Sequence, residues 1–136
     1  MSSSTSIATC ERLADLAEAS AERVEEIAAY NAASTGRFTL LAGSEVNIGP
    51  DGELDYEPEV LERLDWVIAS VHTSFRISPK RMTERVIAAI ENPLVDCIGH
   101  PTGRLINKRE PYEIDIEAVA AAAAEHRTLI EINGNP

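Results

Sequence analysis

Four apolar runs recur along the chain, and each of them ends in polar residues. They read FTLLAGSEVNI (38–48), DWVIASVHTSF (65–75), VDCIGHPTGR (95–104) and RTLIEINGNP (127–136). The segments between them are rich in alanine, glutamate and leucine and favour helix. Buried parallel strands are continuous apolar runs, and strands that alternate with helices form a parallel sheet. The pattern therefore predicts an α/β fold.

The boundaries of the elements follow from turn and cap signals. Ser78-Pro79 has the composition of a helix start, Asn92-Pro93 of a helix end, and Gly49-Pro50-Asp51-Gly52 of a tight turn. The predicted helices span 7–33, 58–63, the segment from Ser78-Pro79 to Asn92-Pro93, and 115–126. The predicted strands span 38–46, 66–71, 95–99 and 128–132.

Polar side chains follow the four predicted strands at regular spacing. Glu45, His72, His100 and Glu131 lie 27, 28 and 31 residues apart, each about the length of one strand-helix unit. The carboxyl ends of parallel strands meet at one edge, so we expect these side chains on one rim. A closed eight-unit barrel needs roughly 200 residues or more, so 136 residues predict only part of a (β/α) barrel.

Composition limits the class of protein. A chain of 136 residues with 44% hydrophobic and 26% charged residues fits one soluble globular domain. Its formal net charge of −11 disfavours nonspecific binding to nucleic acid. Its two cysteines form no CxxC motif or disulfide framework, and no apolar run has the length of a membrane span. We expect a cytoplasmic protein, since the serine-rich start does not resemble a signal peptide.

The rim residues have the chemistry of a metal site. Two histidines and one carboxylate are a common ligand set for zinc, manganese or iron, and leave coordination positions open for water or substrate. Glu45, His72 and His100 supply this set. Either histidine alone would be explained by a hydrogen bond to a loop, but their joint occurrence with Glu45 favours a metal. His126 is explained by its place at a helix C-terminus.

Other rim residues allow two interpretations. Glu131 and Asn133 share strand parity, so either could support the site or bind substrate, while a plain strand-end acid is an equal alternative for Glu131. Arg104 could clamp a phosphate or be a surface arginine. Cys97 should face away from His100 and is expected to be a buried small hydrophobe. The sequence has no GxGxxG, P-loop or GxSxG motif.

Several segments resemble one protein family. AGSEVNIGPDGELDY, DWVIASVHTSF, MTERVIAAIENPLVDCIGHPTGR and EINGNP are similar to the middle of a PHP (polymerase and histidinol phosphatase) domain. The version fused to bacterial and archaeal family X DNA polymerases is the most similar. The resemblance implies a distorted seven-stranded, TIM-like β/α barrel with a trinuclear metal site and 3′–5′ exonuclease or phosphatase activity. Glu45 then matches a carboxylate that bridges two metals, and His72 and His100 match two histidines of the second metal.

The resemblance also implies an incomplete site. The family's HxH pair, early Asp-His elements and late DxH motif have no counterpart in residues 1–136, which we therefore expect to form a single partial PHP domain. We expect one of three metal positions, holding zinc or manganese, and weak or no hydrolysis of phosphate esters. Expected partners are a phosphate ester such as a DNA 3′ end, the rest of the barrel or a polymerase domain, and a second copy through open sheet edges.

Two other hypotheses remain. The chain could be a non-catalytic interaction or regulatory module built on an incomplete barrel. It could also be an unrelated doubly wound α/β domain, in which Glu45, His72 and His100 would not converge.

Overall fold

A computed structural model describes residues 21–36 and 38–132. The chain divides into two compact units, residues 1–43 with 56–65 and residues 44–55 with 66–136. Each unit is described by itself.

The first unit contains helix over residues 21–33 and the short helix α2, Pro58–Leu61. The expected long N-terminal helix is thus present from residue 21, and its expected start lies outside the described residues. The side chain of Asn31, near the end of this helix, donates to Leu40 O (2.8 Å) and accepts from Leu40 N (2.9 Å). These bonds and the contact of Tyr30 with Phe38 hold the returning chain against the helix.

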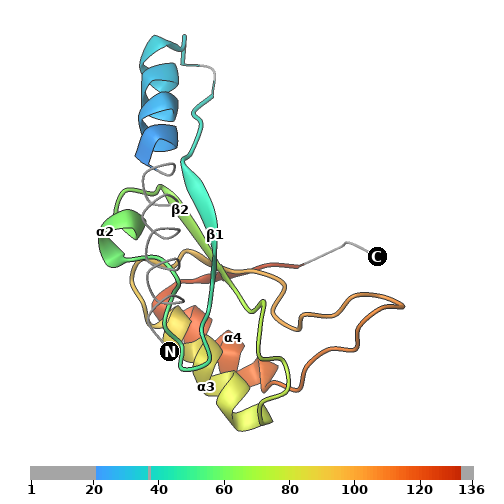
Figure 1. Cartoon of the computed structure of the whole chain (residues 1–136). Coiled ribbons are helices and arrows are strands. Elements are labelled where there is room, and N and C mark those ends of the chain that lie inside the picture. The colour runs from blue at the N-terminus through green and yellow to red at the C-terminus, as the bar shows by residue number, and fades with distance from the viewer. Residues whose placement is uncertain (1–20, 37, 133–136) are drawn as a thin grey trace, which may run out of the picture. The chain divides into compact units, whose positions relative to one another are not determined.

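The second unit is built on a four-stranded parallel sheet with strand order β1-β2-β3-β4 (Figure 1). The strands are β1 Gly43–Asn47, β2 Trp66–Ser70, β3 Cys97–Ile98 and β4 Leu129–Ile130. Cys97 of β3 pairs with Ile68 on one side and Leu129 on the other. The strands follow one another across the sheet without the reversal of order that a doubly wound fold requires. The described residues thus form an open parallel α/β sheet, which is consistent with successive units of a partial β/α barrel.

The strands are shorter than the sequence predicts. The first predicted strand began at residue 38, but β1 begins at Gly43. The reason is a local contact in the first unit, where Asp65 is hydrogen-bonded to both the N–H and the carbonyl of Ala42. Ala42 N donates to Asp65 Oδ2 (2.9 Å), and Asp65 N donates to Ala42 O (2.7 Å). Phe38 and Leu41 are more than half exposed, so no partner strand covers this segment within the described residues.

Helices α3 (Pro79–Ile90) and α4 (Ile116–His126) connect successive strands and contact each other (Figure 1). The predicted cap at Ser78 is confirmed, because Ser78 Oγ accepts from Arg81 N (3.4 Å). The first turn of α4 is capped by Asp115, whose Oδ1 accepts from Ala118 N (3.0 Å). The core of the second unit lies between these helices and the strands. Its buried members include Val67, Ala69, Met82, Val86, Ala89, Ile90, Ile98, Val119 and Ala123.

Within the part of the chain that the structure describes, no helix combines the length and apolar character needed to cross a membrane.

Candidate metal centre

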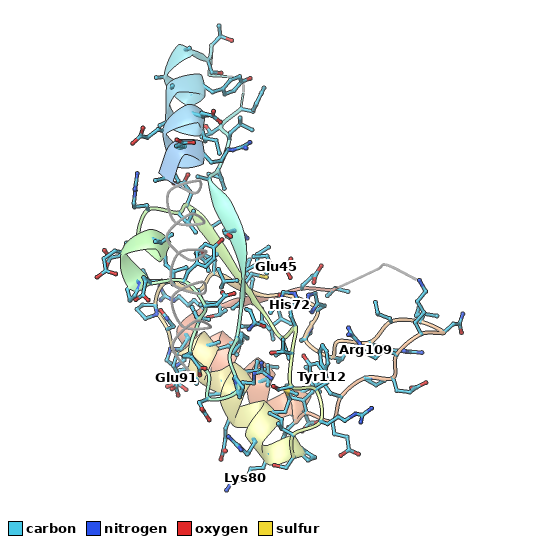
Figure 2. The ribbon with its side chains drawn as sticks, in the orientation of Figure 1. Glu45, His72, Lys80, Glu91, Arg109 and Tyr112 are labelled. Carbon is cyan, nitrogen blue, oxygen red and sulfur yellow. The ribbon has the colours of Figure 1, made fainter. Side chains whose placement is uncertain are left out.

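Three predicted ligands converge at the carboxyl end of the sheet in the second unit. Glu45 lies on β1, His72 two residues beyond β2, and His100 two residues beyond β3. Glu45 Oε1 is 3.2 Å from His72 Nε2 and 3.0 Å from His100 Nε2. One ligand atom from each residue lies within 4.8 Å of the others. Figure 2 shows Glu45 and His72 close together at this end of the sheet.

The separation of these atoms fits a shared cation. Zinc ligands at about 2.0–2.2 Å in a tetrahedral shell lie roughly 3.3 Å from one another. The two distances from the Glu45 carboxylate are close to this value. Both imidazoles present Nε2 to the same carboxylate oxygen, so one small displacement of the three groups would accommodate an ion between them. The donor set of two imidazoles and a carboxylate suits zinc or manganese.

The backbone at His100 makes a tight turn directly after β3. His100 has a φ of +29°, which is uncommon for a non-glycine residue. Its N–H donates to Glu131 Oε2 at 2.6 Å, and its carbonyl accepts from Gly103 N at 2.8 Å. A Cβ at Gly99 would lie only 2.4 Å from Ser70 Oγ. The turn therefore needs a glycine before His100 and a carboxylate directly after the next strand.

His72 is held by the neighbouring strand. Its N–H donates to Asn47 Oδ1 (3.1 Å), and Asn47 is the last residue of β1. The His72 side chain is 45% exposed and that of His100 28%, so the cluster is open to solvent on one side. This openness would leave room for water or substrate.

Nearby polar groups lower the pKa of Glu45. The largest influence is the Ser70 hydroxyl, followed by the opposing effect of partial burial and then by His100 and His72. Ser70 Oγ and His100 Nδ1 are buried and have no hydrogen-bond partner of ordinary geometry among the described residues, so the Ser70 hydroxyl acts as a nearby dipole. The lowered pKa keeps the carboxylate ionised, as a metal ligand must be.

A hollow of about 180 Å³ adjoins the two histidines. Its lining residues are His72, Phe75, His100, Gly103, Arg104, Leu105 and Arg109. Most of its wall comes from the connection between β3 and α4, which is far longer than the usual two to about six residues.

This connection is braced by an aromatic stack. Phe75 stacks on Tyr112 with ring centroids 6.0 Å apart, and the Arg109 guanidinium lies 4.4 Å from the centre of the Phe75 ring. Figure 2 labels Arg109 and Tyr112 on this connection. Arg109 Nε also donates to Gly103 O (2.6 Å). Burial raises the pKa of Tyr112 to about 12 against the smaller effects of Arg85 and Arg109. The wall of the hollow is thus a folded structure that places cationic groups beside the histidines.

The other predicted site residues have different positions. Arg104 is exposed and lines the hollow, as a phosphate-binding residue would. Glu131 contacts the His100 backbone. Asn133 lies outside the described residues. Cys97 is buried, and burial raises the pKa of its thiol.

Sequence reasoning missed Arg85 and the aromatic stack. Arg85 is buried in the middle of α3 and donates to the carbonyls of Ile48 and Thr73. The sequence feature that could have revealed Arg85 is its position as a charged residue within the apolar helical stripe of Met82, Val86 and Ala89.

A parallel α/β sheet with a Glu-His-His cluster at its carboxyl end defines a candidate metal-binding α/β protein. No protein-family model matches the chain. The chain is 44% identical over 120 residues to the DNA polymerase/3′-5′ exonuclease PolX of Bacillus subtilis, covering 88% of the chain and 21% of that protein. It is 45% identical over 100 residues to a probable phosphatase of Thermoanaerobacter sp. (strain X514), covering 71% of the chain and 38% of that protein. A probable phosphatase of Shewanella sp. (strain ANA-3) is 44% identical over 99 residues, or 71% of the chain and 37% of that protein.

These relatives confirm the resemblance drawn from the sequence motifs. The relationship to PolX and to probable phosphatases is consistent with a PHP domain of family X DNA polymerases. The chain spans about a fifth of the length of PolX and under two fifths of the length of the two phosphatases.

Proposed function

We propose that this chain forms one metal position of a PHP-type phosphoesterase. Glu45, His72 and His100 would hold a divalent cation, zinc or manganese, at the carboxyl end of the sheet. The observation that carries the proposal is the convergence of their ligand atoms within 4.8 Å. The names of the relatives, an exonuclease and probable phosphatases, support hydrolysis of a phosphate ester.

The side chains of the site have complementary tasks in this proposal. A divalent cation would lower the pKa of a water molecule and stabilise developing negative charge on a phosphoryl group. Glu45 supplies the negative charge that holds the cation, and the histidines supply neutral donors. Their half-exposed side chains leave an approach from the hollow.

Arg104 and Glu131 would assist in two different ways. Arg104 lines the hollow and carries a planar fork of donors suited to a phosphate group. Glu131 fixes the His100 backbone through the 2.6 Å hydrogen bond and so orients the ring. For Asn133, a role in substrate binding or ligand support remains a proposal from the sequence.

The residues described here offer ligands for one cation. Phosphoryl transfer at paired metals needs further ligands, so we propose that residues 1–136 alone hydrolyse phosphate esters weakly or not at all. The remaining ligands would come from another portion of the barrel or from a polymerase-linked domain. The substrate would be a DNA 3′ end or a small phosphate ester.

A non-catalytic interaction module is the second candidate. It is favoured by the edge strand of the described sheet, β4, because Leu129 on this strand and Ile132 two residues beyond it are 57% and 96% exposed. Such an edge could pair with a second copy. Sedimentation velocity of residues 1–136 would show a concentration-dependent dimer if so, and a monomer at all concentrations would contradict it.

A chimera tests the proposed function directly. The 120 matching residues would replace the corresponding segment of Bacillus subtilis PolX. We expect the chimera to degrade a DNA 3′ end in the presence of manganese, and His100→Ala to abolish this degradation. His126→Ala is the matched control and should retain it, because His126 lies at the end of α4 outside the cluster. A chimera with polymerase activity but no exonuclease activity would contradict the proposal.

A further inference from the structure

Helix α3 buries an arginine that bonds to the loops following β1 and β2, next to two of the candidate metal ligands. Arg85 is only 2% exposed, although arginine is almost never fully buried without a partner. Arg81, one turn earlier on the same helix, is exposed and pairs with Asp51 at 3.0 Å. Arg85 forms no ion pair within residues 21–36 and 38–132. Its burial therefore calls for another explanation.

All the hydrogen bonds of Arg85 go to two backbone carbonyls. Nε donates to Ile48 O at 3.1 Å, with a second contact from Nη2 to the same oxygen. Nη1 donates to Thr73 O at 3.0 Å. Ile48 follows the last residue of β1, and Thr73 follows His72. One planar group thus joins the chain just beyond Glu45 to the chain just beyond His72.

Burial lowers the pKa of the Arg85 guanidinium, and Tyr112 and Glu53 have smaller effects in the opposite direction. Tyr112 stacks on Phe75 and belongs to the connection that follows His100. The guanidinium itself bonds to the loops that follow β1 and β2. A guanidinium has five N–H donors in a fixed plane, whereas a lysine ammonium is a single compact charge and cannot hold two separated carbonyls in the same way.

We propose that Arg85 is a positioning residue for the metal centre. By fixing the carbonyls of Ile48 and Thr73, it sets the distance between the ends of β1 and β2 and the orientation of the His72 ring. The consequence for metal affinity rests on the proposed function, whereas the consequence for His72 does not. A purely structural arginine would affect the stability of the fold but would leave the metal affinity and the orientation of the His72 ring unchanged.

Cobalt binding by the full chain tests the effect on the metal site. Arg85→Lys and Arg85→Met would be titrated with Co²⁺ and followed by visible absorption, at a temperature where circular dichroism shows a folded chain. Loss of an outer partner typically weakens metal binding about 10–100-fold, and we expect a loss of this size with a changed spectrum. Arg81→Lys and Arg81→Met are the matched controls and should bind as the wild type does. Folded Arg85 variants with wild-type affinity and spectrum would overturn the proposal.

Histidine resonances of the metal-free chain give a readout that does not depend on a metal. The chain has three histidines, so His72, His100 and His126 can be assigned by substitution. We expect Arg85→Lys to shift the ring signals of His72 and to leave those of His126 in place. Unchanged His72 signals in a folded variant would overturn the positioning role. A wild-type chain that binds no Co²⁺ but whose His72 signals shift in Arg85→Lys would refute the proposed function alone.

Discussion

The helix-covered core of the second unit and its metal-site rim are built in opposite ways. The core consists of apolar side chains of α3, α4 and the strands, and each of them packs against several others. The rim depends on single polar contacts, such as the one bond from His100 N to Glu131. Stability should therefore be sensitive to the core, and metal binding to individual rim residues. The following predictions test this separation, from the largest expected effect to the smallest.

Ile90→Ala should have the largest effect, and that effect should be on stability. Ile90 is 1% exposed at the end of α3, and truncation of a buried isoleucine costs about 2–5 kcal/mol. Chemical denaturation would measure the loss. Ile116→Ala, at a position 44% exposed on α4, is the control and should change the free energy of unfolding far less. Equal losses in the two variants would contradict the assignment of the core.

Gly99→Ala should reduce both stability and metal binding, because Gly99 lies where the core meets the metal-site rim. The added methyl group would lie 2.4 Å from Ser70 Oγ and 2.9 Å from Ile68 Cγ2. Overpacking of this kind costs about 1–3 kcal/mol, and it should also displace His100 and weaken metal binding. Denaturation and metal titration of one sample would measure both. Gly49→Ala, where a methyl group would meet mainly the Glu53 side chain, should leave metal binding unchanged.

Glu131→Ala should weaken metal binding without a matching loss of stability. It removes the acceptor of the His100 N–H, and the expected loss of affinity is about tenfold. Glu131→Gln keeps an oxygen acceptor and should lose less. Isothermal titration with Zn²⁺ would measure both affinities. If Glu131→Ala bound zinc as tightly as the wild type, the rim would not depend on this contact.

Tyr112→Phe should have the smallest effect at neutral pH and a distinct one in alkali. The pKa of Tyr112 is raised from 10.0 to about 12 in the folded chain, so the unfolded chain ionises first as pH rises. The stability held by the neutral phenol is complete below pH 10 and is lost between about pH 10 and pH 12. Denaturation across this window should show a shallower decline for Tyr112→Phe. Parallel declines would contradict the burial of this hydroxyl.

The sequence predicted the features that local pattern encodes. The cap at Ser78 and the apolar runs placed α3, α4 and the strands, because each depends on neighbours along the chain. The regular spacing of Glu45, His72 and His100 predicted their convergence, since equivalent positions in successive units of a parallel sheet meet at one edge.

The features that the sequence left open depend on contacts between distant residues. Arg85 bonds to Ile48, 37 residues away in the sequence, and Glu131 bonds to His100, 31 residues away. The stack of Phe75 on Tyr112 likewise joins two loops. Helical periodicity shows that Arg85 faces the core but not which carbonyls it meets. In the same way, strand parity places Glu131 on the rim without showing that its partner is a backbone N–H.

Metal content after purification tests the central claim most directly. The chain would be incubated with Zn²⁺ or Mn²⁺ and dialysed, and its metal content would be measured by elemental mass spectrometry. His72→Ala, His100→Ala and the control His126→Ala would be measured in parallel. A single three-ligand position predicts about one metal ion per wild-type chain, loss in the first two variants and retention in the control. A metal-free wild type, or equal metal content in all four proteins, would contradict the account.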